Sequence, residues 1–158
     1  MSNFTDKIAN LYALFARAAN WLQSPLLLAV RLYWGWQFFQ SGWGKFGRLD
    51  KVVEFFTSLG IPLPAVNAYF VAGLEVVGGI LLFVGLGSRL IALPLAFDML
   101  VAYLTADREA LGAVFSDPAK FYNADPFTFL MASLIVLAFG AGIFSLDHLI
   151  ARWHNKSA

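Results

Sequence analysis

The sequence predicts an all-α integral membrane protein, a four-transmembrane-helix bundle with amphipathic interfacial helices. Three observations lead to this prediction. Hydrophobic residues make up 59% of the 158 residues and charged residues only 13%, whereas a soluble domain has about 25% charged residues. The mean hydropathy is +0.68. Several segments are also long and apolar enough to cross a bilayer, which takes roughly 20 residues of helix.

Four segments have the length of a spanning helix, which is about 17–25 residues. They are residues 25–44, 65–87, 90–106 and 126–146. The last of these carries no charged residue, whereas the first three contain Arg31, Glu75 and Asp98 respectively. The connection GLGSR between the second and third segments is short, so we expect these two helices to be antiparallel neighbours.

Two further segments are predicted to be amphipathic helices. In residues 1–24 five apolar side chains share one helical face, and Lys7 and Arg17 fall elsewhere; the five are Ile8, Leu11, Tyr12, Phe15 and Leu22. Residues 50–59 show the same pattern, with Phe56 on the apolar face. Apolar positions at helical spacing with a charged back suit a helix in the headgroup plane. Packing of such a helix against the bundle is the alternative.

The chain is predicted to be a single membrane domain, residues 1–158. The N-terminal segment is amphipathic and lacks the uniform apolar run of a signal peptide, so the first span is expected to remain in the mature protein. An even number of spans puts both termini on one side of the membrane. Lysines and arginines divide evenly between the two sides, so the positive-inside rule does not decide the orientation. We take cytoplasmic termini as the working expectation.

The charges inside the spans predict a buried polar site. A charge at the bilayer centre costs at least ~2.5–3.5 kcal/mol, so such residues usually face protein or water. At a rise of ~1.5 Å per residue, Arg31 and Asp98 lie about 9 and 12 Å in from the terminal side, and Glu75 lies about 15 Å from either end of its span. An arginine stem can reach across that difference, so the three are predicted to form a ligand site. Snorkelling of Arg31 and purely structural bonds of Glu75 and Asp98 are the alternatives.

Other residues are assigned to the rim and to helix packing. Lys45 lies about four helical turns beyond Arg31, so both cations point the same way at opposite depths. Lys45 and Gln40 are therefore predicted to lie at the opposite rim. Small residues let two helices approach closely. The predicted packing residues are Gly35, Gly42, Gly78 and Gly79.

Several cofactors and partners are disfavoured by the composition. The chain has no cysteine, which removes thiolate relays, Cys-bound iron–sulfur clusters and Cys-bound zinc. His148 and His154 lie at or beyond the end of the last span, so a bis-histidine haem and a metal site are not expected. The net charge of +1 does not indicate nucleic-acid binding. The aromatic residues are typical of interfacial belts, although they could flank a flat lipophilic ligand such as a quinone. No catalytic residue is identified.

Four segments resemble the DoxX family of small bacterial membrane proteins. They are RLYWGWQFFQSGWGKF, FFTSLGIPLP, VAGLEVVGGILLFVGLGSRLIAL and GAGIFSLD. The first matches the family's pattern from Arg31 through two glycines to Lys45, and the third matches its Glu–x–x–Gly–Gly pattern at Glu75. The family often has histidine where this chain has Gln40, so chemistry that depends on histidine there is not expected.

The resemblance implies a four-helix, multi-pass protein of the bacterial inner membrane. Some relatives are subunits of membrane redox complexes, including thiosulfate:quinone oxidoreductase. We therefore expect an accessory or binding subunit that contacts membrane lipid, a redox partner protein and a lipophilic small molecule such as a quinone. A small-solute or proton transporter and a stand-alone quinone oxidoreductase are the alternatives. The sequence holds no bound redox centre, which disfavours an isolated enzyme.

Overall fold

The computed structural model describes residues 2–154, with side chains from residue 5 onward, and every element in that part of the chain is an α-helix. Residues 1 and 155–158 of the predicted membrane domain lie outside the described residues. The helices are α1 (Ser2–Phe46), α2 (Leu49–Ser58), α3 (Pro64–Val84), α4 (Ser88–Thr105), α5 (Arg108–Gly112), α6 (Pro118–Tyr122), α7 (Pro126–Phe139) and α8 (Leu146–His154). The all-helical class predicted from the sequence is confirmed.

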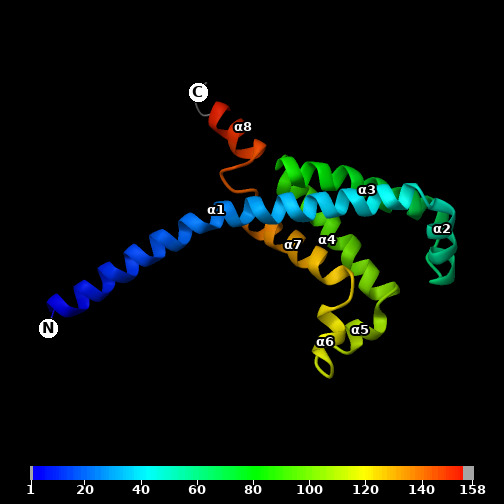
Figure 1. Ribbon diagram of the computed structural model, residues 1–158, viewed down its shortest axis with the longest axis horizontal. Helices are drawn as coiled ribbons and strands as arrows, with labels where there is room; N and C mark the ends of the chain where they lie inside the picture. The colour runs from blue at the N-terminus through cyan, green and yellow to red at the C-terminus, as the bar shows by residue number, and fades with distance from the viewer. Residues whose placement is uncertain (1, 155–158) are drawn as a thin grey trace.

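Helix α1 joins the predicted amphipathic segment, residues 1–24, and the predicted span 25–44 in one continuous helix. It runs for 45 residues and contains Pro25, so at ~1.5 Å per residue it is about 68 Å long. Its first half extends away from the other helices (Figure 1), and Leu11, Phe15 and Trp21 are exposed there. The alternative in which this segment packs on the bundle is therefore wrong.

Helices α3 and α4 are the two described helices that are long and apolar enough to cross a membrane. They correspond to the predicted spans 65–87 and 90–106. Helix α7 has 14 residues, fewer than the ~17 that a spanning helix needs. The predicted helical span 126–146 is too long because Gly140 and Gly142 adopt φ values of +79° and +75°, which end the helix. The four-span arrangement stays a prediction.

Helices α1 and α3 approach each other through glycines. A Cβ atom added to Gly79 would lie 2.5 Å from the backbone nitrogen of Phe39 and 2.6 Å from the carbonyl oxygen of Gly35. A Cβ atom added to Gly42 would lie 2.6 Å from the carbonyl oxygen of Ala72. Such short separations leave no room for a side chain, so these glycines set the distance between the two helices.

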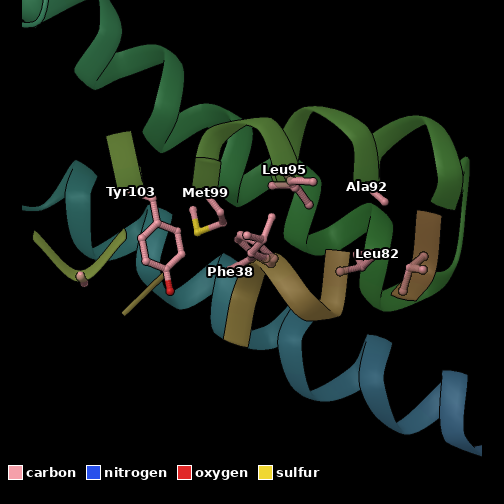
Figure 2. Close-up of a cluster of buried hydrophobic side chains, with 10 residues drawn as sticks. Phe38, Leu82, Ala92, Leu95, Met99 and Tyr103 are labelled. Atoms are coloured by element: carbon pink, nitrogen blue, oxygen red, sulfur yellow. The ribbon is translucent and has the colours of Figure 1, made fainter. Parts of the chain in front are cut away.

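The apolar core lies between α1, α3, α4 and α7. Phe38, Leu82 and Leu95 are buried at its centre (Figure 2). Tyr103 closes the core toward the short helices, because its hydroxyl donates to the carbonyl oxygen of Phe121 at 2.8 Å and the two rings stack 5.0 Å apart. The connection from α4 to α7 is thereby attached to the bundle.

The two ends of the bundle differ. Helix α2 lies at one end and α8 at the other (Figure 1), and we refer to them as the α2 end and the α8 end. Helix α2 has no buried residue and confirms the helix predicted over residues 50–59. At the α8 end the carboxylate of Asp147 accepts hydrogen bonds from the backbone amides of Gly87 at 2.7 Å and Ser88 at 3.0 Å. This carboxylate caps the start of α4.

Candidate functional site

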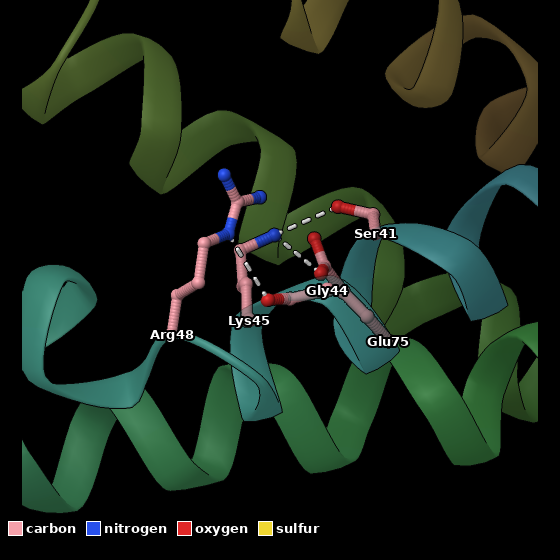
Figure 3. A network of polar contacts seen from close by, with 5 residues as sticks. All are labelled: Ser41, Gly44, Lys45, Arg48 and Glu75. Atoms are coloured by element: carbon pink, nitrogen blue, oxygen red, sulfur yellow. Dashed lines mark hydrogen bonds and ion pairs between the residues drawn. The ribbon is translucent and has the colours of Figure 1, made fainter.

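Lys45 and Glu75 form an ion pair near the α2 end (Figure 3). The Lys45 ammonium, in the last turn of α1, donates to Oε2 of Glu75 on α3 and to Oγ of Ser41 at 2.8 Å. Glu75 is only 3% exposed. A carboxylate at that depth needs a partner, since an unpaired buried charge is strongly unfavourable. Lys45 supplies this partner.

The contact between α1 and α3 explains why these two side chains meet. A Cβ atom on Gly42 would lie 2.9 Å from Cβ of Glu75, so the missing side chain leaves room for the glutamate. Lys45 follows Gly42 by nearly one helical turn and therefore lies just beyond the glutamate. Its flexible stem turns back to reach the carboxylate. Ser41 precedes Lys45 by one turn and accepts the second hydrogen bond.

Asp98 of α4 lies at the same depth as Glu75. The side chain of Leu95 on α4 packs against Gly78 on α3, and the two helices are antiparallel neighbours. Glu75 and Asp98 are each three residues from that contact and on the same side of it. The Oδ2 atom of Asp98 is buried and has no hydrogen-bond partner among the described residues. The site thus combines one paired carboxylate with one unpaired carboxylate.

These groups line a cavity of about 750 Å³ at the α2 end. We call Ser41, Lys45, Glu75 and Asp98 its polar floor. The apolar roof consists of Phe55 and Phe56 of α2 and Leu59 just after that helix, and the walls include Met99, Val101 and Phe129. In the described part of the chain, no group of three or more His, Cys, Asp or Glu residues is placed to hold a metal ion. The cavity is suited to a mainly apolar molecule whose polar group rests on the floor.

Arg31 does not belong to this site. Its side chain is fully buried at the α8 end, where Nη2 donates to the carbonyl oxygen of Phe144 and Nη1 occupies the space beside Gly85. Gly35 of α1 packs against Gly79 of α3, so Arg31 lies about 15 Å along the bundle from Glu75. The predicted cluster of Arg31, Glu75 and Asp98 is wrong in this respect. Full burial also rules out the snorkelling alternative.

The two predicted rim residues have different surroundings. Lys45 lies at the opposite depth from Arg31, as expected, but its ammonium turns inward to Glu75. Gln40 is exposed and does not line the cavity. Ser41 was not singled out, although its spacing of four residues before Lys45 was a readable signal.

The fold and the site define a class of protein: an all-helical membrane protein with a charged cavity beneath an amphipathic helix. This chain belongs to the DoxX family, whose model, described as DoxX, matches residues 26–108. The matched region contains Lys45, Glu75 and Asp98, and the resemblance noted in the sequence is confirmed.

Two relatives cover most of the chain. The Bacillus subtilis protein named "Putative oxidoreductase CatD" is 31% identical over 125 residues, which are 79% of this chain and 87% of that protein. A Haemophilus influenzae protein named "Uncharacterized protein" is 29% identical over 130 residues, which are 80% of this chain and 83% of that protein. No solved structure matches the chain significantly.

Proposed function

We propose that this chain is an accessory membrane subunit of a redox system, and that the cavity beneath α2 binds a lipophilic ligand of the quinone class. The observation that carries the proposal is the polar floor, with its Lys45–Glu75 ion pair, under the apolar roof. The name of the Bacillus subtilis relative, which includes the word oxidoreductase, favours a redox role.

The cavity suits such a ligand in size and chemistry. Its volume of about 750 Å³ falls within the ~300–1,000 Å³ typical of sites for small molecules. An ammonium group has three N–H donors, and Lys45 uses two of them on Ser41 and Glu75. The third is available for a ligand oxygen. Phe55 and Phe56 provide apolar surface for a ring and its tail.

Each floor residue has a stated task in this proposal. A quinone, when bound, supplies the capacity to accept and release electrons together with protons. Lys45 binds and orients the ligand oxygen, and Glu75 holds the ammonium in place. Helix α2 covers part of the floor with apolar side chains. Because the chain has no cysteine, thiolate relays and Cys-bound clusters must be supplied by another protein, so electron transfer is assigned to a redox partner.

The proposal includes an arrangement in the bacterial inner membrane. The second half of α1 together with α3, α4 and α7 forms the four-span bundle, and the termini are cytoplasmic. Helix α7 is about 21 Å long at ~1.5 Å per residue, which is shorter than the bilayer core. The non-helical residues 140–145 therefore complete this span toward the α8 end.

Native mass spectrometry with lipid extraction tests the proposal on the full chain, gently solubilised from quinone-containing bacterial membranes. Wild type is compared with Glu75→Gln and with Glu109→Gln, which removes a carboxylate from the exposed Glu109–Lys120 pair. We expect wild type and Glu109→Gln to retain quinone and a partner protein, and Glu75→Gln to lose the quinone. Wild type without quinone, or equal retention in all three proteins, would contradict the ligand site. Quinone turnover by the isolated chain would contradict the accessory role.

A further inference from the structure

The two carboxylates of the polar floor differ in one respect. Glu75 is paired with the Lys45 ammonium. Asp98 lines the same cavity, and its buried Oδ2 atom accepts no hydrogen bond from the described residues. A buried acceptor without a donor is unfavourable in free energy. A ligand group that donates to this acceptor therefore gains more binding free energy than the same group gains at the surface.

The charges around the cavity also favour a ligand that donates a hydrogen bond. Its lining contains four acidic side chains and two basic ones: Glu75, Asp98, Asp107 and Asp125 against Lys45 and Arg108. Arg108 uses its Nε atom on the carbonyl oxygen of Leu104, and Lys45 is committed to Glu75. The formal excess of negative charge disfavours an anionic ligand and favours one that presents a hydrogen-bond donor.

We infer that Asp98 determines the specificity of this cavity by selecting lipophilic ligands that carry a hydroxyl donor. The inference rests on the proposed function and deepens it. For a quinone-class ligand, the hydroxyl-bearing reduced form donates to Oδ2 of Asp98, whereas the oxidised form has only acceptor oxygens and leaves that atom without a donor. Lys45 donates to a ligand oxygen in either form. The reduced form is therefore the one that the floor holds more tightly.

A pair of stable probes isolates the donor. The full-length chain in lipid nanodiscs is titrated with para-heptylphenol and with its methyl ether, which has the same body but no O–H. We compare wild type with Asp98→Asn, which keeps an acceptor without the charge, and with Asp98→Leu, which removes the acceptor. Glu109→Gln is the matched control, because it removes an exposed carboxylate that does not line the cavity.

Because the phenol satisfies a buried acceptor that the ether leaves without a donor, wild type should bind the phenol about tenfold more tightly than the ether. The preference should be smaller in Asp98→Asn, close to onefold in Asp98→Leu, and unchanged in Glu109→Gln. If wild type binds both probes without preference, or if Asp98→Leu keeps the preference, the inference about Asp98 is overturned while the ligand cavity stands. If wild type binds neither probe, the proposed function fails together with the inference.

Discussion

The Lys45–Glu75 ion pair makes a quantitative prediction about stability. Removing one partner of a buried ion pair costs about 3–5 kcal/mol, because the other charge is left uncompensated. The Lys45 side chain is 26% exposed, so water screens part of the interaction and the lower end, about 3 kcal/mol, applies to Lys45→Met. For a chain of this length that loss corresponds to a fall in melting temperature of about 6–12 °C.

Variants of Glu75 show whether the loss of stability comes from the ion pair or from the individual side chains. Glu75→Leu should cost less than Lys45→Met, because the freed ammonium can turn toward the open part of the cavity. The double variant Lys45→Met/Glu75→Leu should be more stable than Lys45→Met alone, since no unpaired buried charge remains.

Thermal unfolding in detergent, followed by circular dichroism, measures these differences. Lys120→Met, which breaks the exposed Glu109–Lys120 pair, is the control and should melt with wild type. A Lys45→Met protein that also melts with wild type, or a double variant whose loss is the sum of the single losses, would refute the account of the pair.

Three further predictions concern the packing and the ends of the helices. Gly79→Ala forces α1 and α3 apart by about 0.9 Å to reach ordinary contact at 3.4 Å and should cost about 1–3 kcal/mol, whereas Gly73→Ala on the same helix meets nothing within 4 Å; equal melting temperatures would contradict this. Gly85→Ala places its Cβ 1.7 Å from Nη1 of Arg31 and needs a φ of +74°, so it should lower the melting temperature, and an unchanged melting temperature would count against the close packing of Arg31. Asp147→Asn should speed hydrogen exchange of the first amides of α4, measured by mass spectrometry, because their carboxylate acceptor loses its charge; unchanged exchange would argue against the cap.

Much of the helical architecture was readable from the sequence. The apolar runs at residues 65–87 and 90–106 became α3 and α4, and the amphipathic pattern at residues 50–59 became α2. Hydropathy did not locate the end of α7, because Gly140 and Gly142 belong to the same apolar run. Their positive φ values are backbone conformations, which side-chain hydropathy does not report. The continuity of α1 through Pro25 was missed for a related reason, since a change in side-chain pattern does not require a break in the helix.

The partner of Glu75 was not predicted correctly. Depths counted from predicted span ends placed Arg31 within reach of Glu75 and put Lys45 at the far rim. The observed contact of Gly35 with Gly79 shifts Arg31 to the level of Gly85 and brings Lys45 to within one turn of the glutamate. Such a register depends on which small residues of two helices contact each other, and this pairing cannot be predicted from a single sequence. The shared depth of Glu75 and Asp98 was closer to prediction, because a short turn sets the α3–α4 register.

The central claim is that the cavity beneath α2 is a ligand site, and photolabelling of the membrane-reconstituted chain tests it most directly. A lipophilic quinone with a photoreactive diazirine is added, and the labelled residues are identified by mass spectrometry. Labels on Phe56 of α2 and on Met99, which faces the cavity from α4, are the predicted result, and excess unlabelled quinone should remove them. Labels confined to exposed residues of α4 such as Leu90 and Phe97, with none in the cavity, would contradict the account.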